Sequence, residues 1–157
     1  MAEKNIQTWL AEYSESHRNK TNKAIHWVCV PLIFLTIVAF LWAIPTPAFF
    51  NQVPYLNFAT LGALFIVLFY IRLSVTLTIG MTLFTLLCLW LVASYEAMFP
   101  GKLVITAAIA FVILWIGQFI GHHVEGKKPS FFKDIQFLMI GPAWVMAFIM
   151  RKIGVKY

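Results

Sequence analysis

The sequence predicts an all-α integral membrane protein: a bundle of about four transmembrane helices, with an amphipathic helix at the N-terminus and a re-entrant or fifth helix at the C-terminus. Of the 157 residues, 61% are hydrophobic and only 11% are charged, whereas a soluble domain is about half apolar and a quarter charged. The apolar residues form runs of about twenty, the length that crosses a bilayer. A chain this short is expected to form one membrane domain, 1–157.

The N-terminal segment predicts a helix over residues 5–17. Ile6, Trp9, Leu10 and Tyr13 recur at i, i+3, i+4 and i+7, which gives the helix one apolar face. We expect this face to lie in the membrane interface against the cytoplasmic ends of the bundle. His17 continues the face, so it should point toward the protein or the lipid headgroups.

Four apolar runs predict the spanning helices, at residues 24–44, 56–72, 74–99 and 102–121. Polar residues precede the first run, and Thr21 or Asn22 is the expected N-cap. An uncharged loop, 45–55, follows that run. A tight turn at 72–74 and then Pro100-Gly101 connect the later helices.

A last apolar stretch, 131–150, is interrupted by Gly141-Pro142 and closed by Arg151 and Lys152. Two readings stay open. The interruption favours a re-entrant hairpin that returns the basic end to the cytoplasmic side. A full fifth span is the alternative.

The basic residues set the expected orientation. They cluster before the first span and again after the fourth, at Lys4, Arg18, Lys20, Lys23, Lys127, Lys128 and Lys133. By the positive-inside rule both of these ends are cytoplasmic, in a bacterial inner membrane or the endoplasmic reticulum. The net charge of +6 is explained by this placement. No basic motif with interleaved aromatics is present, so nucleic-acid binding is not expected.

All four histidines lie in the two segments that this topology brings to one membrane face. His17 and His26 flank the start of the first span, and His122 and His123 end the fourth. Polar groups at membrane depth need partners, so the two segments are expected to meet. Adjacent helical residues point about 100° apart, which makes His123 the weakest candidate.

The residues around the histidines are those of a metal site. Histidine is the commonest metal ligand, and its second ring nitrogen usually needs an orienting partner. Asn22 lies one turn before His26, and Gln118 lies one turn before His122. Glu125 is a candidate carboxylate ligand or general base. Imidazoles with a carboxylate suit non-haem Fe(II), although zinc accepts the same ligands.

Two spaced motifs carry a resemblance to a known family. The first is Tyr13-x3-His17-x4-Asn22-x3-His26-x4-Pro31, and the second is Gln118-Phe119-Ile120-Gly121-His122-x2-Glu125-x3-Pro129, with Gly141-Pro142 after it. Together they resemble the signatures of the Mpo1-like (DUF962) family over nearly the whole chain.

The resemblance implies an Fe(II)-dependent dioxygenase of fatty-acid α-oxidation, which converts a 2-hydroxy fatty acid and O2 to the acid one carbon shorter and CO2. The residues that match the family's motifs are His17, Asn22, His26, Gln118, His122 and Glu125. We expect His17, His26 and His122 to ligate one iron, with His123 or Glu125 completing the ligand set. Asn22, Gln118 and Glu125 would assist catalysis. Lys127 and Lys128 would attract the anionic head of the substrate. The alternative is a non-enzymatic lipid-binding membrane protein whose histidines contact headgroups.

Overall fold

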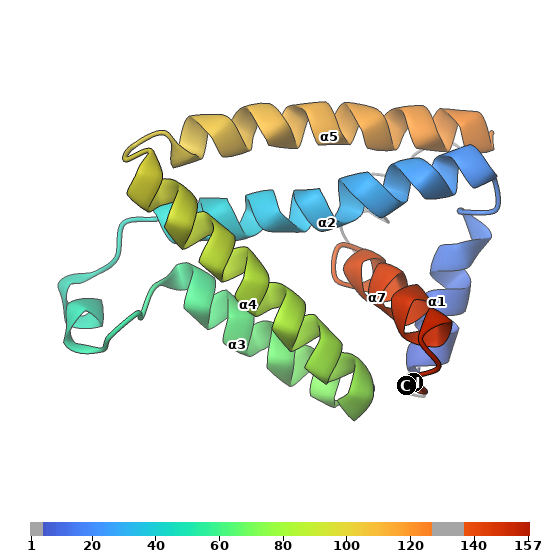
Figure 1. The fold of residues 1–157 in the computed structure, drawn as a ribbon, viewed down its shortest axis with the longest axis horizontal. Coiled ribbons are helices and arrows are strands. Elements are labelled where there is room, and N and C mark those ends of the chain that lie inside the picture. The colour runs from blue at the N-terminus through green and yellow to red at the C-terminus, as the bar shows by residue number, and fades with distance from the viewer. Residues whose placement is uncertain (1–4, 127–136) are drawn as a thin grey trace.

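The computed structural model describes residues 5–126 and 137–157 (Figure 1). Within these residues the chain forms six α-helices and one short 3-10 helix, and no strand. In order they are α1 (Ile6–Glu15), α2 (Lys20–Ala43), η1 (Ala48–Gln52), α3 (Phe58–Ile71), α4 (Val75–Met98), α5 (Leu103–Glu125) and α7 (Ile140–Lys152). The predicted all-α fold is confirmed.

The first long helix, α2, begins earlier than the apolar pattern predicts. The side chain of Asn19 accepts hydrogen bonds from the backbone N–H groups of Thr21, at 2.8 Å, and Asn22, at 3.4 Å. Asn19 is therefore the N-cap, and the expectation of Thr21 or Asn22 in that place is wrong. The helix gains one polar turn from Lys20, and this turn positions Asn22 for the site described below.

The fourth predicted span, α5, ends later than predicted. It continues four residues beyond Gly121 to Glu125 and ends at Gly126, which adopts the left-handed conformation with φ of 73°. Glycine reaches this conformation without steric strain, which makes it the usual C-terminal residue. His122 and Glu125 therefore lie in the last helical turn.

Three of the described helices, α2, α4 and α5, are long and apolar enough to cross a membrane. α3 has 14 residues and α7 has 13, so they measure about 20 Å each, less than the roughly 30 Å of the hydrocarbon core. Gly141-Pro142 lies in the first turn of α7, where proline removes no helical hydrogen bond. Of the stretch 131–150, residues 131–136 lie outside the described residues, and the described part contains the short helix α7.

The outer face of α5 has the surface of a membrane protein. Large aliphatic side chains along it are exposed: Val104, Ile105, Ile109, Val112, Ile113, Ile116 and Ile120. Only 17% of the most apolar 18-residue stretch of α5 is buried inside the protein. A surface this apolar over a whole helix is stable in lipid and unstable in water.

Two features of the packing position the site. α2 and α5 lie side by side and antiparallel, so the start of α2 meets the end of α5 (Figure 1). α1 packs on α7 beside that meeting point, and its Ile6, Leu10 and Tyr13 are buried as the periodicity predicts. The C-terminal end of α1 is thereby held next to the start of α2 and the end of α5.

Candidate metal centre

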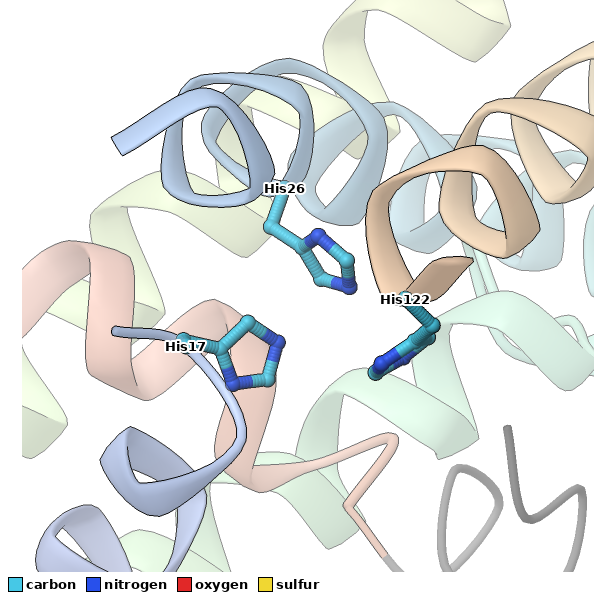
Figure 2. Close-up of side chains that lie close together, drawn as sticks. All are labelled: His17, His26 and His122. Carbon is cyan, nitrogen blue, oxygen red and sulfur yellow. The ribbon is translucent and has the colours of Figure 1, made fainter. Parts of the chain in front are cut away.

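Three histidines from three elements meet at this point. His17 follows α1, His26 lies in the second turn of α2, and His122 lies in the last turn of α5; Figure 2 shows the three rings around a common centre. The ring centroid of His17 lies 4.3 Å from that of His26 and 5.6 Å from that of His122, and the last two are 4.9 Å apart. The predicted meeting of the two segments is confirmed.

The three rings are buried and close enough to share one metal ion. His17 is 3% exposed, His26 is 1% exposed and His122 is 6% exposed. One nitrogen from each ring lies within 4.8 Å of the other two. His123 is exposed and is not brought into this group.

Hydrogen bonds to the backbone fix the tautomer of two of these rings. Nδ1 of His17 lies 2.6 Å from the carbonyl oxygen of Tyr13, and Nδ1 of His26 lies 3.0 Å from that of Asn22. A carbonyl oxygen only accepts, so each neutral ring carries its proton on Nδ1 and keeps a lone pair on Nε2. This is the arrangement in which histidine ligates a metal through Nε2.

The lone pair of His17 is otherwise unused. Among the described residues, its buried Nε2 atom has no hydrogen-bond partner. A buried polar atom left without a partner costs free energy and calls for an explanation. A shared metal ion fits, because it would accept electron density from three converging imidazole nitrogens.

The protein also keeps His17 in the ligating form. Burial is the main cause that lowers the pKa of this imidazole to about 4; the neighbouring His122 also lowers it, and the Tyr13 carbonyl opposes the shift. The ring is therefore neutral at physiological pH. Neutral imidazole is the form that binds metals, because protonation removes the lone pair.

Aromatic packing holds the His17 ring in place. The ring of Tyr13 stacks on it with centroids 4.2 Å apart, and Trp144 of α7 lies 5.5 Å away. The indole nitrogen of Trp144 donates to the hydroxyl of Ser14 at 2.9 Å. Sequence reasoning missed Trp144, because its role depends on the docking of α7 against α1.

Glu125 joins the end of α5 to the loop between α1 and α2. Its carboxylate accepts from the backbone N–H groups of Arg18, at 2.8 Å, and Asn19, at 2.9 Å, and from the Asn22 side chain at 2.9 Å. The loop carrying His17 is thus fastened to the helix carrying His122. These bonds give Glu125 a structural part in the centre, and its part as a ligand or base stays a prediction.

Asn22 is the buried link in this arrangement. It is fully buried, and its amide group donates to the carbonyl of Ser16 at 3.0 Å as well as to Glu125. The backbone carbonyl of Asn22, and not its side chain, holds His26. The sequence predicted a link between these two residues but attributed it to the side chain.

Gln118 faces a small cavity beside the histidines. The cavity has a volume of about 40 Å³, and His26, His122 and several apolar side chains also line it. The buried Oε1 atom of Gln118 has no hydrogen-bond partner within the described residues. The cavity therefore offers a polar acceptor next to two of the candidate ligands.

Two glycines allow α5 to approach α2 this closely. A Cβ atom at Gly121 would collide with Oδ1 of Asn22 and lie 3.0 Å from the His26 ring. One at Gly117 would lie 2.9 Å from the sulfur of Cys29. Small residues at such spacing are typical of close helix contacts in membranes. The role of Gly121 was not predicted, although the motif contains it.

Lys127 and Lys128, the predicted contacts for the substrate head, lie outside the described residues.

Comparisons with known proteins add the family. Searches among curated proteins and among solved structures return no significant match. The family model described as 2-hydroxy-palmitic acid dioxygenase Mpo1-like matches residues 3–153, which include all three clustered histidines. With the match covering nearly the whole chain, the protein belongs to the Mpo1-like family.

Proposed function

We propose that the protein is a non-haem Fe(II)-dependent dioxygenase that shortens 2-hydroxy fatty acids by one carbon. The observation that carries the proposal is the buried group of His17, His26 and His122, in which two rings have Nδ1 bound to a carbonyl and Nε2 left for a ligand. The description of the family, 2-hydroxy-palmitic acid dioxygenase Mpo1-like, supports the reaction type and the substrate class.

The donor set fits iron. Three imidazole ligands would leave coordination positions open on an iron ion, as in mononuclear iron sites. When bound, the iron would supply the redox chemistry that couples O2 to a spin-paired organic substrate. Zinc accepts the same ligands but has no redox chemistry, so the proposed reaction requires a redox-active metal, for which we propose iron.

The reaction balances without an external reductant. A 2-hydroxy acid and O2 give the acid one carbon shorter, CO2 and water. The bond between C1 and C2 breaks, the substrate loses four electrons, and O2 accepts four. The reaction therefore needs no reductase domain and no flavin.

The chain's own residues contribute orientation and exclusion of water. The small cavity beside His26 and His122 has room for a hydroxyl group or for O2 but not for a whole fatty acid. Gln118 Oε1 could accept a hydrogen bond there from a donor such as the substrate hydroxyl. Glu125 and Asn22 hold the loop that carries His17.

The membrane placement proposed with this function follows the positive-inside rule. The α2 start carries Lys20 and Lys23, so the centre would lie at the cytoplasmic face of a bacterial inner membrane or the endoplasmic reticulum. A site at this depth meets the head of an amphiphile whose tail lies among the apolar helices.

The burial of the three rings supports a metal centre over the headgroup-binding alternative. Histidines that contact lipid headgroups need exposed rings, and these are at most 6% exposed. Their nitrogens also face one another (Figure 2).

The proposal is tested with purified protein loaded with Fe(II) under argon and then given air and 2-hydroxypalmitate. We expect the fifteen-carbon acid by mass spectrometry, with one oxygen atom from ¹⁸O2. The His122→Ala variant should give none, and His123→Ala, its exposed neighbour, should retain activity. Iron-loaded, folded protein that forms no shortened acid from any chain length would refute the proposal.

A further inference from the structure

A second, larger hollow borders the metal centre. It lies between α1, α2 and α7, has a volume of about 560 Å³, and includes His17 in its wall. Sites for small molecules typically measure 300–1,000 Å³, so this hollow has the size of a substrate site. The cavity beside His26 and His122, at about 40 Å³, holds little more than one or two water-sized molecules.

The rim of the hollow is cationic. Arg18, Lys23 and Arg151 line it, and all three are exposed. Glu15 is the one carboxylate among the described lining residues, so the rim is net positive. None of the three cations forms an ion pair within the part of the chain that the structure describes. No described carboxylate neutralises them, so they are suited to bind an anion from outside the protein.

Three aromatic side chains also line the hollow. Trp27 and Phe148 contact each other edge to face with centroids 4.5 Å apart, and Trp144 lies beside them next to His17. Aromatic faces pack well against methylene groups. Exposed cations beside aromatic side chains match an amphiphile that has an anionic head and an alkyl chain.

We infer that this hollow binds the carboxylate end of the long-chain acid and that Arg18, Lys23 and Arg151 select an anionic amphiphile over a neutral one. The inference rests on the proposed function. Arginine suits this task, because its planar fork pairs with both oxygens of a carboxylate. The sizes of the two spaces differ: the hollow on the His17 side is large enough for the carboxylate end of the acid, and the small cavity holds only O2, water or the hydroxyl group of the substrate.

The experiment measures binding and not turnover. The full-length protein in neutral detergent, without iron, is titrated with palmitate brominated in mid-chain, and quenching of tryptophan fluorescence reports binding. The matching brominated alcohol is the neutral probe. Neither ligand has the 2-hydroxyl group, so neither can react. A failed dioxygenase assay would therefore leave this test valid, and a failed binding test would leave the dioxygenase assay valid.

The test variant is Arg18→Gln, Lys23→Gln and Arg151→Gln together, which keeps the backbone N–H of Arg18 that Glu125 binds. Exposed ion pairs are individually weak, so we expect about 3-fold weaker palmitate binding per residue and about 30-fold for the triple variant. Alcohol binding should change less than about 2-fold.

The matched control is Lys20→Gln, Lys152→Gln and Lys156→Gln, which removes the same charge from exposed neighbours outside the hollow. This control should bind palmitate with an affinity within about 2-fold of the wild type, if the affinity lost in the test variant comes from charges at the hollow and not from the net charge of the protein.

Four results would overturn the inference. The triple variant could bind palmitate as the wild type does, or the control could lose as much affinity. Lys127→Gln with Lys128→Gln could account for the whole effect instead. Finally, vesicles of phosphatidylglycerol could depend on Arg18, Lys23 and Arg151 while palmitate does not, which would make the hollow a lipid headgroup site.

Discussion

A methyl group added at Gly121 is expected to disturb the metal centre without removing any ligand. Its Cβ atom would overlap Oδ1 of Asn22 and lie 3.0 Å from Cε1 and 3.1 Å from Nδ1 of His26. Both neighbours are buried and hydrogen-bonded, so neither can move without breaking a contact. Either the Asn22–Glu125 bond lengthens or the His26 ring turns from the centre.

The magnitude follows from two opposing effects. Alanine is a better helix former than glycine by about 1 kcal/mol, whereas overpacking a tight contact costs about 1–3 kcal/mol. The net loss of stability for Gly121→Ala should thus be about 0–2 kcal/mol. Metal affinity should fall further, by about 10–100-fold, as is typical when the groups that orient a ligand shift.

The assay measures thermal unfolding by circular dichroism and metal affinity by competition with a chelator. Gly117→Ala is the matched control: it lies one turn earlier on the same face of α5, but its Cβ would meet Cys29 and not the histidine. It should lose stability while keeping most of its metal affinity. Unchanged metal affinity in Gly121→Ala would refute the packing argument.

Three further predictions concern single side chains. His122→Ala should lose the metal in plasma emission analysis and remain folded, whereas His123→Ala should keep it; metal retained in His122→Ala would count against the centre. Glu125→Gln should lower stability by about 1 kcal/mol, because a neutral amide accepts more weakly from two backbone N–H groups; an unchanged melting temperature would contradict this. For the metal-free protein, the His17 pKa of about 4 lies below the ordinary 6.5, so the folded state binds fewer protons between these pH values. The contribution of His17 to the free energy of unfolding should be constant above pH 7 and fall by up to about 3 kcal/mol as the pH drops to 4. The His17→Phe variant should lack this contribution.

The sequence was sufficient for the features that depend on local pattern. The period of Ile6, Leu10 and Tyr13 predicted α1 and its buried face. The apolar runs and the distribution of Lys and Arg predicted that the start of α2 and the end of α5 meet. Every step of that argument used neighbours in sequence or the length of a membrane span.

The features that the sequence did not predict depend on contacts between distant segments. Glu125 binds residues more than 100 positions away, and Trp144 reaches Ser14 over 130 positions. The prediction of the N-cap of α2 was wrong for a local reason: the side chain of Asn19 accepts hydrogen bonds from two backbone N–H groups ahead of the apolar run. A single sequence contains no direct signal for contacts between segments that are far apart in the chain.

The packing around the histidines does not depend on a metal ion, so we expect metal binding and folding to be separable. α1 is held to α7 by Ile6, Leu10 and Tyr13 and by the bond from Trp144 to Ser14, none of which requires a metal. His17 and His26 each have a backbone carbonyl partner, and His17 is kept neutral by burial. In small zinc domains, by contrast, the metal supplies the folding free energy. Here contacts that need no metal bring the three nitrogens together, so we expect removal of a bound ion to abolish activity while the helical bundle persists.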